Sequence, residues 1–83
     1  MKAIYFAWVR ERIGLAEEVI APPREVETVG QLVDWLAARG DNYAAAFANP
    51  KTIRAAIDKT HAAPDAPIAA AREIAFFPPM TGG

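Results

Sequence analysis

Hydrophobic and polar positions alternate with the period of a β-strand near both ends of the chain. Residues 2–9 are rich in aromatic and β-branched side chains, which predicts a strand. Alternation places Lys2, Ile4, Phe6 and Trp8 on one face of this strand, and Ala3, Tyr5, Ala7 and Val9 on the other. Residues 73–77 predict the last strand, with Ile74 and Phe76 on one face and Glu73, Ala75 and Phe77 on the other. Both segments are largely apolar, so we expect them to be inner strands of one sheet.

A helical period appears in the middle of the chain. Thr28 and Gln31 form a capping box at the start of a predicted helix. Its apolar stripe consists of Val29, Leu32, Val33 and Leu36, and Trp35 flanks the stripe. Arg39 suits the last turn of the helix, and Gly40 suits a left-handed residue just after it.

The remaining segments predict shorter elements. Residues 10–16 read as a polar turn around Gly14, and residues 17–21 as a second strand that forms a hairpin with the first. An alanine-rich segment within residues 41–49 predicts a short second helix. Residues 52–59 predict a third strand, residues 61–67 a loop, and Ile68 the start of a very short strand. Strands, a helix and further strands indicate an α+β domain, with one mixed sheet and a main helix across one face.

Composition narrows the possible functions. The chain has 83 residues, 9 basic and 10 acidic side chains and a net charge of −1, so we expect one small domain that binds no nucleic acid. It contains no cysteine and only one histidine, His61, which we interpret as a surface residue; we expect no metal site. The sequence shows neither an apolar run of membrane-spanning length nor a signal-peptide pattern, so we expect a cytoplasmic protein without membrane contact.

The last eight residues, FFPPMTGG, carry the most specific signal. Pro78 and Pro79 lack an N–H and cannot extend a strand, so they favour a stiff, extended exit from the domain. The segment 78–83 can reach about 20 Å when fully extended. Gly82 and Gly83 have no side chain and would fit a narrow active-site channel, where the α-carboxylate of Gly83 could react after activation.

This ending resembles the C-terminal signature of the small, sulfur-carrier subunits of molybdopterin synthase. The segment FAWVRE at residues 6–11, with Gly14 after it, is similar to the N-terminal part of the same family. The resemblance implies a ubiquitin-like β-grasp domain over residues 1–77, with the last strand parallel to the first in mid-sheet. Residues 78–83 would form an extended C-terminal tail.

The resemblance also implies a division of chemical work between proteins. A ubiquitin-activating-like adenylyltransferase would use ATP to adenylate Gly83, and a sulfur donor enzyme would convert it to a thiocarboxylate. The tail segment Pro78, Pro79, Met80, Thr81 and Gly82 would then insert into the large synthase subunit, in a heterotetramer. That subunit would supply the catalytic side chains, and the sulfur would pass to a cyclic pyranopterin. The carrier itself would bind no cofactor and would catalyse no reaction alone.

A partner interface is expected on the solvent-facing side of the sheet. If the first and last strands are neighbours, Phe6, Trp8 and Phe77 form an apolar patch beside the tail, with Arg10 at its edge. The alternative is that these aromatic residues belong to the core and that Arg10 is an ordinary surface arginine.

The sequence departs from the family pattern at two places. Ala69-Ala70-Ala71-Arg72 replaces an Asp/Gly turn before the last strand, so we expect a helical or loosely bent approach there. Position 58 is Asp, where relatives often carry an amide. The alternatives for function are a sulfur carrier for thiazole or tRNA thiolation, a ubiquitin-like protein modifier, and an interaction module with an inert terminus.

Overall fold

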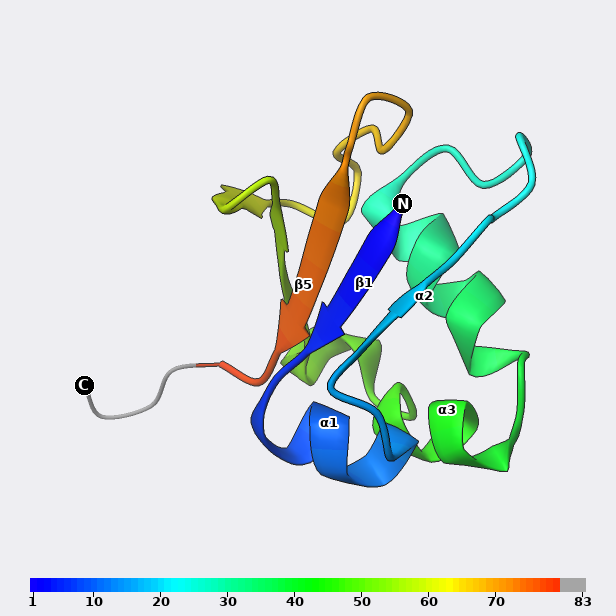
Figure 1. Cartoon of the computed structure of the whole chain (residues 1–83), viewed down its shortest axis with the longest axis vertical. Helices are drawn as coiled ribbons and strands as arrows, with labels where there is room; N and C mark the ends of the chain where they lie inside the picture. Colours follow the sequence, from blue (N-terminus) through cyan, green and yellow to red (C-terminus); the bar gives the residue numbers. More distant parts are fainter. Residues whose placement is uncertain (80–83) are drawn as a thin grey trace.

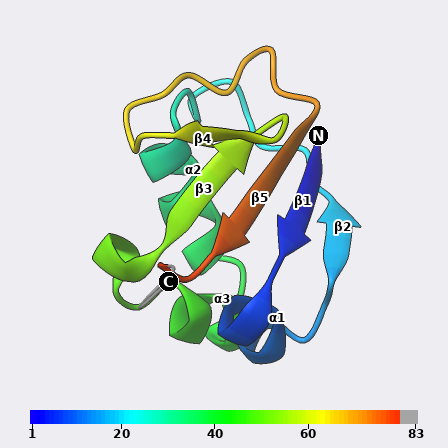
Figure 2. The same cartoon turned by 90° about the vertical axis from the view of Figure 1, so that its left-hand side faces the viewer.

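The computed structural model describes residues 1–79, which form a mixed five-stranded sheet with helices on one side (Figures 1 and 2). The elements in chain order are β1 (Lys2–Tyr5), α1 (Ala7–Ile13), β2 (Glu17–Val19), α2 (Val29–Ala37), α3 (Asp41–Ala46), a 3₁₀ turn η1 (Pro50–Thr52), β3 (Arg54–Ile57), β4 (Thr60–Ala62) and β5 (Glu73–Phe77). The strand order is β2-β1-β5-β3-β4. This architecture confirms the predicted α+β fold class.

The first and last strands lie side by side at the centre of the sheet. β1 and β5 are parallel, and their register pairs Lys2 with Glu73 and Tyr5 with Phe76. β1 pairs antiparallel with β2, while β5 pairs antiparallel with β3. The parallel central pair that the family resemblance implied is therefore confirmed.

The core fills the space between the sheet and α2. Phe76 is fully buried; its ring stacks on Tyr5 with centroids 6.3 Å apart and meets Phe47 edge-on at 5.4 Å. The predicted α2 stripe is buried over these rings: Val29, Leu32, Val33 and Leu36. The apolar stripe of α2, which repeats every 3.6 residues, and the buried face of β5, which repeats every two residues, therefore pack together in one apolar layer.

Helix α2 begins where the sequence predicts but ends differently. The Thr28 hydroxyl accepts a hydrogen bond from Gln31 N at 3.2 Å, and Gln31 Oε1 accepts one from Glu27 N at 2.6 Å. The prediction for Gly40 was wrong, because its φ of 165° is extended backbone rather than left-handed. Instead, Ala38 ends the helix in right-handed geometry, with its N–H donating to Asp34 O. The short helix predicted within residues 41–49 is confirmed as α3.

The predicted strand over residues 2–9 is wrong beyond Tyr5. Phe6 N still donates to Phe76 O, but Ala7 has a φ of 51° and the chain turns into α1. Val9 and Ile13 are buried one helical turn apart, and Gly14 ends α1 at a φ of 92°, in the left-handed region that favours glycine. The predicted turn over residues 10–16 is therefore mostly helix. β2 pairs antiparallel with β1 as expected, although a helix and not a simple turn connects them.

The segment before β5 also differs from its prediction. Residues 61–67, predicted as a loop, begin inside β4, which pairs with β3 across a tight turn at Asp58 and Lys59. Residues 69–70 form a turn, and Ala71 N donates to Ile68 O at 3.0 Å. Asp58 Oδ1 accepts hydrogen bonds from the backbone N–H groups of Arg72 and Glu73, at 3.1 and 3.0 Å. Asp58 therefore fixes the start of β5 without a glycine turn.

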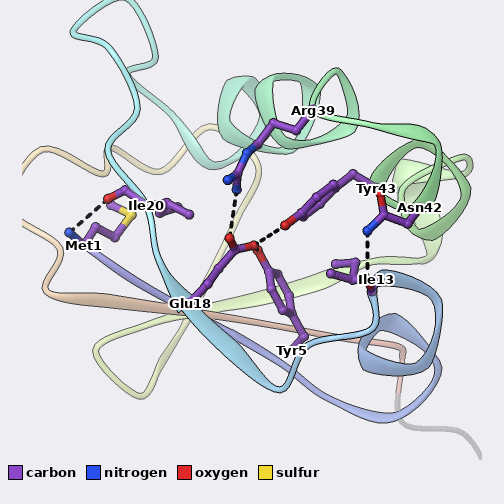
Figure 3. A network of polar contacts seen from close by, with 8 residues as sticks. All are labelled: Met1, Tyr5, Ile13, Glu18, Ile20, Arg39, Asn42 and Tyr43. Carbon is purple, nitrogen blue, oxygen red and sulfur yellow. Dashed lines mark hydrogen bonds and ion pairs between the residues drawn. The ribbon is translucent and has the colours of Figure 1, made fainter.

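A polar network ties β2 to the helices (Figure 3). Glu18 Oε2 accepts hydrogen bonds from the hydroxyls of Tyr5, at 2.8 Å, and Tyr43, at 2.6 Å. Glu18 Oε1 lies 3.2 Å from Nη1 of Arg39, whose guanidinium also stacks on the Tyr43 ring at 4.9 Å. Desolvation opposes ionisation of Glu18, but the bonds from Tyr43 and Tyr5 and the charge of Arg39 prevail and lower its pKa. Burial and the adjacent carboxylate raise the pKa of Tyr5 and of Tyr43.

We expect Glu18→Gln to lower the free energy of unfolding by about 1–3 kcal/mol at pH 7, because charged hydrogen bonds are lost. Since folding lowers the pKa of Glu18, its contribution is complete above about pH 4.5 and is lost as the pH falls through the folded-state value. The free energies of unfolding of the wild-type protein and the variant, measured in urea between pH 7 and pH 3, should therefore approach each other as the pH falls.

Glu17→Gln is the matched control. Glu17 pairs with Lys2 at 2.6 Å on the exposed surface, so we expect a change within about 0.5 kcal/mol. Equal losses in the two variants would contradict a special role for the Glu18 network.

Candidate functional site

The candidate site begins where β5 ends. Phe77 is the last residue of β5, and Pro78 and Pro79 carry the chain away from the sheet on the side opposite α2 (Figure 1). Both prolines are half-buried, and neither can donate a backbone hydrogen bond to prolong the strand. The other residues predicted for insertion and sulfur transfer, Met80, Thr81, Gly82 and Gly83, lie outside the described residues.

No helix of residues 1–79 covers the side of the sheet that faces the viewer in Figure 2. On this side, an apolar surface lies beside the exit of β5. We call it the open face, and it consists of Ile4, Phe6, Val19, Ala56, Ala75 and Phe77. Phe6 is 49% exposed and Val19 is 82% exposed, while the other four are half-buried. A folded domain seldom leaves adjacent apolar side chains in water without a partner that covers them.

Polar side chains border the open face. Lys2 and Glu17 form an ion pair across β1 and β2. On the other side, Arg54 is the register partner of Phe77, and the His61 ring meets the Phe77 ring edge-on at 5.5 Å. His61 is exposed as predicted, although it lies in β4 and not in a loop. The open face thus has the apolar centre and polar rim of a protein interface.

Two of the residues predicted for this face lie elsewhere. Trp8 and Arg10 both belong to α1, because the strand ends at Tyr5. Trp8 is half-buried against the core, with the guanidinium of Arg12 4.3 Å from its ring centroid, and Arg10 is exposed on the helix. The prediction that placed both residues on a sheet face by strand alternation was therefore wrong. The i, i+4 spacing of Val9 and Ile13 was the signal for a helix. Phe6 and Phe77 do share the open face, as expected.

The described residues, 1–79, contain neither a cluster of metal-ligating side chains nor a long apolar helix. No group of three or more His, Cys, Asp and Glu side chains there could hold a metal ion. In the same part of the chain, no helix has both the length and the apolar composition needed to cross a membrane.

Comparison with known proteins decides the family. The chain matches the model of the ThiS family over residues 3–83. It is 40% identical to the molybdopterin synthase sulfur carrier subunit of Escherichia coli, over 100% of this chain and 99% of that protein. It is 34% identical to the subunit of the same name from Haemophilus influenzae, with the same coverage of both chains. The chain belongs to the ThiS family.

Solved structures agree with this assignment at the level of the fold. The chain is similar to SAMP1 from Haloferax volcanii, with a TM-score of 0.73, 26% identity, and coverage of 100% of this chain and 98% of that one. A putative molybdopterin converting factor, subunit 1, from Pyrococcus furiosus has a TM-score of 0.75 at 22% identity, covering 95% of each chain. Together with the parallel β1–β5 pair, these likenesses identify the domain as a ubiquitin-like β-grasp.

The adjacent residues Phe76 and Phe77 test the division between core and open face. We expect Phe76→Ala to lower the free energy of unfolding by about 3–5 kcal/mol, because it leaves a cavity in a fully buried layer. Phe77→Ala removes a half-buried ring and should cost about 1 kcal/mol or less. Chemical denaturation of the two variants measures both values, and similar losses would place Phe77 in the core.

Proposed function

We propose that this chain is the sulfur carrier subunit of a molybdopterin synthase and that the α-carboxylate of Gly83 carries the sulfur. The observation behind the proposal is the 40% identity over the full chain to a subunit of that name. The exit of β5 through Pro78 and Pro79, beside an apolar open face, provides the physical setting. Such a domain can dock on a partner while its tail extends into the partner's active site.

Sulfur transfer through a carboxylate requires activation, since a carboxylate is a poor electrophile. An ATP-dependent adenylyltransferase would form an acyl-adenylate at Gly83 and release pyrophosphate. A sulfur nucleophile from a donor enzyme would attack the acyl carbon, forming a C–S bond as the C–O bond to AMP breaks. Where the donor carries this sulfur as a persulfide, a second thiol then attacks the donor's sulfur in the resulting acyl disulfide, so that the thiocarboxylate leaves and the donor ends as a disulfide. The sequence contains no cysteine, so this chain cannot hold the sulfur as a cysteine persulfide.

The final transfer would take place in the large subunit of the synthase. There the thiocarboxylate sulfur at Gly83 would form a C–S bond to a cyclic pyranopterin as a C–O bond of the pterin breaks. Hydrolysis of the resulting thioester by water would leave the sulfur on the pterin and return the tail to the carboxylate form. Gly82 and Gly83 add no side chains that would obstruct a narrow channel. The open face would bind the large subunit and bring the tail to the channel at high effective concentration.

We expect the intact mass of the protein to increase by the difference between sulfur and oxygen after incubation with ATP, a cognate adenylyltransferase and a sulfur donor. Removal of Gly83, or addition of one residue after it, should abolish this gain and sulfur transfer while the circular dichroism spectrum stays unchanged.

Three other outcomes would contradict the proposal. Conjugates between Gly83 and lysine side chains of other proteins would indicate a protein modifier, and sulfur transfer by the truncated chain would exclude Gly83 as the carrier. A loaded carrier that transfers sulfur only in thiazole or tRNA thiolation would support the other sulfur-carrier families.

If the open face is the interface with the large subunit, a substitution on this face should weaken binding to that subunit. We expect Phe77→Ala to weaken this binding by about 1–3 kcal/mol, in the range of an aromatic interface residue, and by more than it lowers stability. Trp35→Ala, which truncates a half-buried aromatic residue on α2, should leave binding unchanged. Isothermal titration calorimetry measures both affinities, and an unaltered affinity for the Phe77 variant would exclude the open face as the interface.

A further inference from the structure

A second apolar hollow lies on the helix side of the sheet. It is a groove of about 520 Å³ between the first half of α2, strands β3 and β4, and the 3₁₀ turn η1. Figure 2 shows β3 and β4 with α2 behind them. Its apolar lining comes from Val29, Val33, Ile53, Ala55, Ala62 and Phe76. The volume lies within the range of about 300–1,000 Å³ that is typical of ligand pockets.

The walls of the groove are fixed by hydrogen bonds. Gly30 N donates to Pro64 O at 2.8 Å, and Val29 N donates to Ala66 O at 3.0 Å. These two hydrogen bonds hold the loop after β4 against α2. A Cβ at position 30 would lie 3.3 Å from Pro64 O, so glycine permits this close approach. Because these two N–H groups already have partners, the start of α2 does not serve as an anion site. The groove is preformed, so a ligand would lose little binding energy in ordering it.

The charged residues that line the groove are all basic. Lys51 lies in η1 and Arg54 is the first residue of β3, and no Asp or Glu of residues 1–79 lines the groove. Nη1 of Arg54 donates to Lys51 O at 2.9 Å, which holds the guanidinium near this rim. The whole chain has a net charge of −1, so this cationic rim is a local feature. An apolar floor with a cationic rim is complementary to aliphatic groups flanked by carboxylates.

We propose that this groove docks a short segment of a partner protein in which aliphatic side chains alternate with acidic ones. The inference rests on the proposed carrier function, because a carrier must be recognised by several partners that all require its tail. The floor of the groove lies on the helix side of the sheet, whereas Arg54 and His61 border both the groove and the open face. A partner in the groove can therefore leave the centre of the open face and the tail available. His61 lines the groove and also contacts Phe77, so it lies where the two surfaces meet.

The experiment uses the full chain labelled with ¹⁵N and a hexapeptide of three leucines alternating with three glutamates. We expect amide shifts to change at Val29, Val33 and Ala62, and the peptide to bind about tenfold more tightly than a matched peptide with lysines in place of glutamates. Shifts confined to the open face, equal affinity for the two peptides, or no binding at millimolar peptide would each overturn the proposal.

Two charge variants complete the test. Lys51→Glu should weaken the binding of the acidic peptide severalfold and strengthen the binding of the lysine peptide, because it reverses one charge of the rim. Lys59→Glu makes the same change in net charge at the β3–β4 turn, away from the groove, and should affect neither peptide. Equal effects of both variants would attribute binding to net charge and overturn the groove assignment. The mass gain at Gly83 does not involve the peptides, so failure of the groove proposal and failure of the carrier function are distinguishable.

Discussion

The parallel pairing of β1 with β5 is the constraint on which the rest of the structure depends. It joins residues at the two ends of the chain, with Tyr5 opposite Phe76, and it is extended by the hydrogen bond from Phe6 N to Phe76 O. This register places Phe76 in the core and Phe77 on the open face. A shift of one residue would exchange them, exposing a core ring and changing where the tail leaves the sheet.

The contacts on the helix side make that register costly to change. Phe76 packs against Tyr5 and Phe47, and the hydroxyl of Tyr5 reaches Glu18, which also holds Tyr43 and Arg39. At the other end of β5, Asp58 accepts hydrogen bonds from the N–H groups of Arg72 and Glu73. Both ends of the strand that precedes the tail are therefore fixed, and Pro78 begins at a defined point of the surface.

The two sides of the sheet serve different purposes. The helix side carries the buried apolar core, so most of the hydrophobic stabilisation arises there. The open face keeps apolar side chains accessible beside the tail, which suits transient docking more than stability. In the proposed carrier, this separation would leave the binding surface outside the core.

The sequence by itself determined the features that arise from local periodicity or from covalent structure. The α2 stripe, its Thr28 cap, the two faces of β5 and the proline exit all follow from spacing within a few residues. For residues 6–13 the strand alternation and the i, i+4 spacing of Val9 and Ile13 disagree, and the tertiary structure decided between them: the chain turns at Ala7 into α1, which removes Trp8 and Arg10 from the sheet. The Glu18 network, the role of Asp58 and the groove beside η1 each combine residues from segments far apart in the chain. Such contacts depend on how the elements pack, and no local pattern records them.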